Sequence, residues 1–125
     1  GGSHTVMEEQ VEIRLRLLLG SSIAIGPGKA ELLRGIRDTG SIAAAGRRMN
    51  MSYRRSWLLV RTMNTCFREP LVDATKGGSG GGGARLTDAG LRVLALYEEM
   101  ERKALQSIAE EAAGLRAMMR DAPQE

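Results

Sequence analysis

The segment from Gly40 to Phe67, GSIAAAGRRMNMSYRRSWLLVRTMNTCF, constrains the fold of this chain more than any other part of the sequence. Its pattern predicts two short helices joined by a tight turn. Ser41 can cap the first helix, expected to run to about Met49, because a serine hydroxyl accepts a hydrogen bond from a free amide of the first turn. Asn50 tolerates the left-handed conformation that a tight turn requires, and Ser52 can cap the second helix.

The second helix is predicted to have two distinct faces. Apolar and amide side chains three or four residues apart are expected to face the core, namely Trp57, Val60, Met63, Asn64 and Phe67. The opposite face is basic, with Arg54, Arg55 and Arg61. Such a helix is expected to pack on one side and to present positive charge on the other.

These two helices match the helix-turn-helix plan, in which the second helix enters the DNA major groove. Small residues from Ala43 to Gly46 would let the first helix cross close over the second. An ordinary helical hairpin is the alternative, because two helices and a turn occur in most folds that contain helices.

A hairpin with a glycine-rich tip is predicted from Leu71 to Leu86, LVDATKGGSGGGGARL. Leu71 and Val72 fit one short strand, and Ala84 to Leu86 fit a returning strand. Lys76 and Arg85 flank the tip with positive charge, which is typical of a DNA-binding wing. A flexible linker between two domains is the alternative. A phosphate-binding loop is disfavoured, since no Gly-Lys-Ser or Gly-Lys-Thr follows the glycines.

Three stretches together resemble a known family: GSIAAAGRRMNMSYRRSWLLVRTMN, EPLV and KGGSGGGGARLTDAG. They are similar to the N-terminal winged helix-turn-helix domain of the ModE-type molybdate-responsive transcription regulators, a domain related to that of the LysR-type regulators. The resemblance covers roughly Val11 to Ile108. It implies a domain that binds double-stranded DNA as a homodimer, with the helix from Ser52 in the major groove and the wing against the DNA backbone.

The resemblance leaves molybdate sensing unsupported. The full regulators of that family continue into C-terminal oxyanion-binding domains, whereas this sequence stops at Glu125. We therefore expect a DNA-binding domain without a molybdate site. Neither a cofactor nor a metal is expected, because His4 is the only histidine and no cluster of metal-ligating residues is visible.

Ser52, at the start of the second helix, is among the residues expected at the DNA interface, and the other expected contacts divide into two kinds. Contacts to base edges are expected from Tyr53, Arg54 and Arg55 in the first turn of the second helix, because arginine can bind guanine through two hydrogen bonds. Contacts to phosphates are expected from Ser41, Arg47, Arg48, Arg61, Lys76 and Arg85. The alternatives are a solvated helix face for the arginines and packing against the preceding helix for Tyr53. A lone indole such as Trp57 is expected in the core.

The segments on either side complete a mainly α-helical fold with a small antiparallel β-wing. Alternating residues from Val11 to Leu19 predict a half-buried strand beside the wing strands, with Ser22 to Ile25 as a possible short return. A helix is predicted from Pro27 to about Thr39, ended by Gly40. The expected segments are a disordered tag remnant at 1–10, the DNA-binding domain at 11–86, a dimerisation helix at 87–120 and a disordered tail at 121–125.

The dimerisation helix is predicted from apolar residues that recur at close to the coiled-coil period: Leu94, Tyr97, Leu105, Ile108 and Leu115. A helix this long cannot bury its apolar stripe against so small a domain, so a second copy is expected to cover it. A helix folded back at Gly114 within one monomer is the alternative.

Composition is compatible with these assignments. Eighteen Lys and Arg against 15 Asp and Glu give a net charge of +3, which permits nucleic-acid binding without requiring it. Cys66 is the only cysteine, and neither a signal peptide nor a membrane-spanning apolar run is visible, so a cytoplasmic location is expected. An enzyme is not expected. A protein-interaction module whose basic face is incidental is the rival function.

Overall fold

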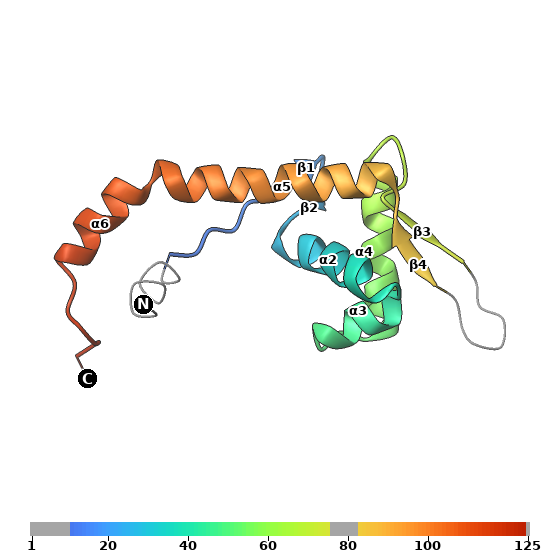
Figure 1. Cartoon of the computed structure of the whole chain (residues 1–125), viewed down its shortest axis with the longest axis horizontal. Coiled ribbons are helices and arrows are strands. Elements are labelled where there is room, and N and C mark those ends of the chain that lie inside the picture. The colour runs from blue at the N-terminus through green and yellow to red at the C-terminus, as the bar shows by residue number, and fades with distance from the viewer. Residues whose placement is uncertain (1–10, 76–82, 125) are drawn as a thin grey trace. The chain divides into compact units, whose positions relative to one another are not determined.

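The computed structural model describes residues 11–75 and 83–124 (Figure 1). The predicted tag remnant at 1–10 and the wing tip from Lys76 to residue 82 lie outside the described residues. The described elements are β1 (Leu17–Leu19), β2 (Ser22–Ile25), α2 (Pro27–Thr39), α3 (Ile42–Arg48), α4 (Tyr53–Cys66), β3 (Val72–Ala74), β4 (Ala84–Leu86), α5 (Asp88–Ser107) and α6 (Ala109–Ala117).

The chain divides into two compact units. The larger unit spans Arg14–Glu98 and contains the elements from β1 to the first half of α5. Among the described residues, the smaller unit consists of 11–13 and 99–124. None of the helices in the described ranges combines the length and apolar character needed to cross a membrane.

Helix α2 begins and ends where the sequence predicts. Pro27 occupies its first turn, where a missing amide hydrogen costs nothing. Gly40 ends the helix in the left-handed conformation, with a φ of 72°, and its N–H donates to the Ile36 carbonyl at 2.8 Å. The side chains on the inner face of α2 are buried: Ala30, Leu32, Leu33 and Ile36.

Helices α3 and α4 form the predicted helix-turn-helix. Ser41 Oγ accepts the Ala44 N–H and Ser52 Oγ accepts the Arg55 N–H, each at 3.1 Å, so both serines cap their helices as expected. Asn50, in the turn, has a φ of 55°. Its left-handed conformation was predicted from the residue type.

Helix α3 crosses α4 and α2 at positions where the side chains are small. A Cβ atom added to Gly46 would collide with the Ser56 hydroxyl, and one added to Gly35 of α2 would lie 2.8 Å from Ala45 Cβ. Ser56 is fully buried, and its hydroxyl donates to the Ser52 carbonyl at 2.9 Å. The run of small residues therefore permits the close crossing that the sequence predicts.

Strands β3 and β4 form the base of the predicted wing. They pair antiparallel, with Val72 opposite Leu86. The Ala84 N–H also donates to the Gly40 carbonyl at 2.9 Å, which ties β4 to the turn between α2 and α3. The fold of the larger unit is thus a winged helix-turn-helix.

The N-terminal strand differs from the prediction. Residues 11–16 form no regular element, and β1 pairs with β2 rather than with the wing, so each of the two sheets in the described residues has two strands. Gly20, with a φ of 60°, lies in the short turn that closes the β1–β2 hairpin. Closing so short a turn costs less chain entropy than bringing a distant strand into register. This difference favours β2 over the wing as the partner of β1.

Two of the predicted dimer contacts instead lie in the core of a single chain. Leu94 and Tyr97 are each 1% exposed and belong to the core cluster formed with α2, α4 and the wing. The Tyr97 hydroxyl donates to the Leu15 carbonyl at 2.8 Å. The prediction that Leu94 and Tyr97 face a second copy is therefore wrong, because their own chain already covers them.

The single C-terminal helix of the prediction is two helices. α5 ends at Ser107 and α6 begins at Ala109, whereas Gly114, the fold-back point of the alternative, lies inside α6. The Ser107 hydroxyl donates to the Ala104 carbonyl at 2.9 Å. A serine hydroxyl that bonds a carbonyl of the preceding turn competes with the backbone N–H groups for that carbonyl. This competition favours an interruption of the helix.

The crossing of α3 and α4 yields a prediction about stability. We expect Gly46→Ala to lower the free energy of unfolding by about 1–3 kcal/mol, because the new methyl group would collide with Ser56. Chemical denaturation would measure the change. Gly28→Ala is the matched control: no atom lies within 4 Å of its added Cβ, so the same substitution is expected to keep or slightly raise stability. Equal effects of the two substitutions would contradict the collision.

Candidate nucleic-acid interface

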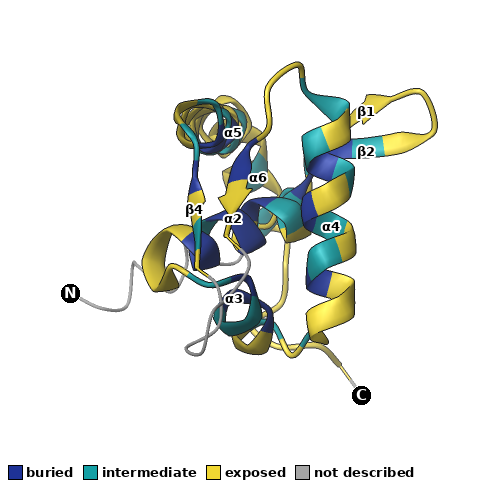
Figure 2. Ribbon diagram, turned by 90° about the vertical axis from the view of Figure 1, so that its right-hand side faces the viewer, coloured by how far each residue is buried: buried dark blue, intermediate teal, exposed yellow. Residues whose placement is uncertain are grey.

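The outer face of α4 is basic and exposed. Arg54, Arg55 and Arg61 are exposed, whereas Val60 and Met63 on the other side are buried (Figure 2). None of these three arginines forms an ion pair with another described residue. Their charge is therefore available to an anionic ligand, as the sequence predicts.

The start of α4 is held in place by two serines. The Ser52 side chain caps the helix through the Arg55 N–H, and Ser56 bonds back to the Ser52 carbonyl. These bonds fix the turn that carries Arg54 and Arg55. Ser52 is thus engaged within the protein, and its predicted place at the DNA interface stays a prediction.

Tyr53 is both exposed and in contact with its own helix. Its side chain is 57% exposed, and its ring meets Trp57 edge to face, with 6.1 Å between ring centroids. Trp57 is half-buried and packs against the core cluster, as predicted. Both interpretations of Tyr53, packing and ligand contact, therefore remain compatible with its position.

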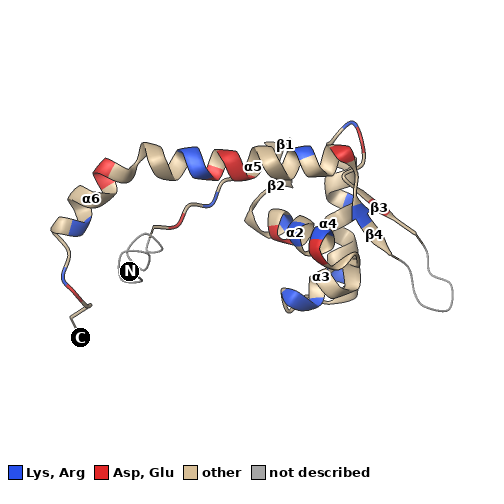
Figure 3. Ribbon diagram, viewed as in Figure 1, with Lys and Arg blue, Asp and Glu red and all other residues tan. Residues whose placement is uncertain are grey.

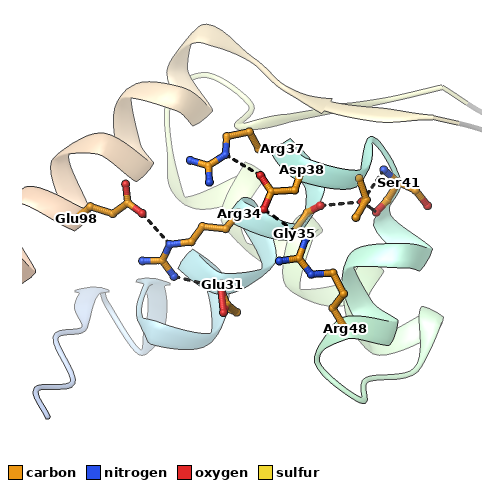
Figure 4. Close-up of polar contacts among 9 residues, drawn as sticks. Glu31, Arg34, Gly35, Arg37, Asp38, Ser41, Arg48 and Glu98 are labelled. Carbon is orange, nitrogen blue, oxygen red and sulfur yellow. Dashed lines mark hydrogen bonds and ion pairs between the residues drawn. The ribbon is translucent and has the colours of Figure 1, made fainter. Parts of the chain in front are cut away.

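The end of α3 brings two arginines with different surroundings. Arg48 Nη1 lies 3.4 Å from Asp38 Oδ2, and Arg37 Nε lies 3.2 Å from Asp38 Oδ1 (Figure 4). The hydrogen bond from Arg37 keeps the pKa of the Asp38 carboxyl below its ordinary value, and the positive charge of Arg37 and the hydrogen bond and charge of Arg48 act in the same direction. Arg47 is exposed and has no ion pair among the described residues. Arg47 is therefore the freer of the two for a phosphate.

Arg85 is the described basic residue of the wing. Its side chain is 83% exposed and lies 4.0 Å from the Asp73 carboxylate on the paired strand. An ion pair this exposed contributes little to stability. Arg85 can therefore exchange Asp73 for a phosphate at a small cost in free energy. Figure 3 shows basic residues on β4 and at the end of α3. Lys76, the other predicted wing contact, lies outside the described residues.

Asn64 joins α4 to the wing. Its Oδ1 accepts the N–H groups of Leu71, at 2.8 Å, and Val72, at 3.2 Å, while its Nδ2 donates to the Val72 carbonyl at 3.2 Å. The sequence predicts that Asn64 faces the core but not the segment that it contacts. One amide side chain thus supplies the backbone bonds that a neighbouring strand would give to the start of β3.

Lys29 is a basic residue that the sequence analysis did not select. It lies on α2, where partial burial lowers the pKa of its ammonium group and the positive charge of Arg55 lowers it further. The electrostatic effect of Cys66 raises this pKa. Lys29 therefore adds positive charge near α4, which spacing along α4 alone could not reveal.

The remaining predicted dimer contacts are exposed. Leu105 and Ile108 are each 38% exposed and Leu115 is 65% exposed, all within the smaller unit. The described residues include no cluster of three or more His, Cys, Asp or Glu side chains that could hold a metal ion.

Comparison with known proteins agrees with the resemblance seen in the sequence. The transcriptional regulator ModE of Yersinia pestis is 34% identical over 113 residues, which are 88% of this chain and 43% of that protein. The DNA-binding transcriptional dual regulator ModE of Escherichia coli K12 is 34% identical over 107 residues, 83% of this chain and 41% of that protein. This chain is a homologue of the ModE-type regulators. It spans less than half the length of these relatives, and no family model matches it.

A solved structure supports the fold of this chain independently. The crystal structure of a LysR family transcriptional regulator aligns with a TM-score of 0.54 over 75% of this chain and 30% of that one. The two share 14% sequence identity, so the likeness concerns the fold alone.

The Asn64 contacts yield a second prediction. We expect Asn64→Ala to lower the free energy of unfolding by about 1–3 kcal/mol, because the N–H groups of Leu71 and Val72 would lose their acceptor. Thr62→Ala is the control. The Thr62 hydroxyl donates to the Leu58 carbonyl within α4 at an exposed position, so its loss leaves no buried group without a partner. Thermal or chemical unfolding would compare the three proteins. An Asn64→Ala protein as stable as Thr62→Ala would show that the wing is held by other contacts.

Proposed function

We propose that this chain is a sequence-specific double-stranded DNA-binding domain of a transcription regulator. The observation that carries the proposal is the outer face of α4, where exposed arginines without ion partners among the described residues follow a capped helix start. The ModE-type relatives, one of which is named as DNA-binding, support the same function. A helix of this kind after a tight turn has the geometry that enters a major groove.

In this proposal the contacts divide as the sequence predicts. Arg54 and Arg55 read base edges, and Tyr53 reaches the same groove if its ring leaves Trp57. The backbone phosphates are bound by residues from α3, α4 and the wing: Ser41, Arg47, Arg48, Arg61, Lys76 and Arg85. Arg48 would exchange Asp38 for a phosphate. Breaking such an exposed ion pair costs little free energy.

The functional unit is proposed to be a homodimer on a near-palindromic site in the cytoplasm. Leu105, Ile108 and Leu115 supply exposed apolar surface that a second copy could cover. A twofold dimer would present two α4 helices to half-sites about one DNA turn apart, or a multiple of a turn.

A protein-interaction module without specific DNA binding is the second candidate. It is favoured by the amount of apolar surface along α5 and after it, at Leu91, Leu96, Met100, Leu105, Ile108, Leu115, Met118 and Met119. This candidate predicts DNA affinity that is absent or equal for all sequences at physiological salt.

DNA binding can be tested by selecting duplexes from a random pool with the purified protein at about 150 mM salt, where non-specific binding is weak. We expect an enriched inverted repeat. Arg54→Ala and Arg55→Ala are each expected to cost about 1–3 kcal/mol of binding free energy and to relax the preference at one position. Arg92→Ala, which removes an exposed arginine from α5, is the control of equal charge. An unenriched pool would favour the interaction module.

Dimerisation yields a separate prediction. Leu115→Glu is expected to raise the dimer dissociation constant at least tenfold, because it places a charge in an apolar contact. Sedimentation equilibrium would measure the constant. Leu18→Glu on β1, where the leucine is 66% exposed, is the matched control and should leave the dimer intact. A wild-type chain that stays monomeric, or a Leu115→Glu chain that dimerises normally, would refute this contact.

A further inference from the structure

Leu58 is an apolar residue in the middle of the basic face of α4. Its side chain is 51% exposed. Arg54 precedes it by four residues and Arg61 follows it by three, so the three side chains lie on one side of the helix. Leu58 thus occupies the surface that the proposed function places in the major groove.

The direction of Leu58 excludes a role in the core. The buried residues of α4 are Ser56, Val60 and Met63. At 100° per residue, Leu58 lies within roughly 20° of the direction opposite to their mean. Its neighbour Leu59 is half-buried and packs against the core cluster, whereas Leu58 is absent from that cluster. Packing in the core therefore does not explain a leucine at this position.

Isolated exposed leucines are common on protein surfaces, and exposure alone assigns no role to them. The setting of Leu58 is what distinguishes it. The other exposed leucines of the larger unit lie on β1 or on α5, and none of them shares a helix with an arginine of the proposed interface. Leu58 lies on the same helix as Arg54, Arg55 and Arg61. It therefore meets the same ligand surface as those arginines.

A leucine side chain has no hydrogen-bond donor or acceptor, so it can distinguish bases only through an apolar group. In the major groove that group is the C5-methyl of thymine. Four residues of helix separate Leu58 from Arg54, a rise of about 6 Å, and successive base pairs are about 3.4 Å apart. A base met by Leu58 is therefore expected within about two base pairs of one met by Arg54.

We propose that Leu58 is a specificity-determining residue that contacts the methyl group of a thymine in each half-site. This inference rests on the proposed function and names a base that α4 selects. Arg54 or Arg55 would read guanine through hydrogen bonds, and Leu58 would add a preference for thymine about two base pairs away.

The test replaces single thymines by uracil, which removes only the methyl group, in a duplex recovered from the selection. For the wild-type protein we expect one thymine in each half-site whose replacement weakens binding about fourfold, the factor that corresponds to one buried methyl group. For Leu58→Ala we expect the thymine and uracil duplexes to bind equally. Leu91→Ala, which shortens a 46% exposed leucine on α5, is the matched control and should keep the fourfold difference.

The outcomes separate this inference from the function on which it rests. If a specific site is recovered but Leu58→Ala retains the wild-type response to uracil, or if no thymine responds in the wild-type protein, Leu58 does not read a methyl group and the DNA-binding function stands. If no sequence is enriched, both the function and the role of Leu58 are refuted. Because Leu58 is exposed, its replacement by alanine is expected to leave the fold intact.

Discussion

The close crossing of α3 and α4 is the constraint on which the remaining structure depends. Gly46 has no side chain, and this absence leaves the space that the Ser56 hydroxyl occupies. Ser56 then bonds the Ser52 carbonyl, so the same contact that joins the helices also fixes the first turn of α4. A larger residue at either position would shift the arginines of that turn relative to the core. Packing between small residues thus determines where Arg54 and Arg55 point.

The wing depends on α4 and on the end of α2 through backbone groups rather than through apolar packing alone. Asn64 holds the start of β3, and the Gly40 carbonyl accepts the Ala84 N–H of β4. Each strand of the hairpin therefore has a partner outside the hairpin. A two-stranded ribbon is marginally stable in isolation, so these bonds are what give the wing base a fixed position relative to α4.

The sequence predicts the parts of this fold that local chemistry decides. Ser41 and Ser52 were correctly identified as caps, because a serine before an apolar run satisfies amides within one turn. Periodicity was less informative about partners. It showed that Leu94 and Tyr97 have an apolar side, but whether the same chain or a second copy covers that side depends on tertiary packing. For the same reason the alternation from 11 to 19 could not identify β2 as the neighbour. Arg54 and Arg55 are exposed as predicted, and their contacts with DNA stay a prediction.

Charge placement explains why a net charge of +3 understates the affinity for anions expected of α4. Carboxylates accompany several arginines of the other helices: Arg34 lies 2.7 Å from Glu98, and Arg48 shares Asp38 with Arg37 (Figure 4). The arginines of α4 have no such partners among the described residues. Acidic residues thus neutralise much of the basic charge away from α4 and leave its outer face positive. A phosphate backbone meets local rather than net charge, because screening limits these interactions to about 8 Å at physiological salt. The distribution of ion pairs, rather than the excess of basic residues, is therefore the electrostatic argument for DNA binding.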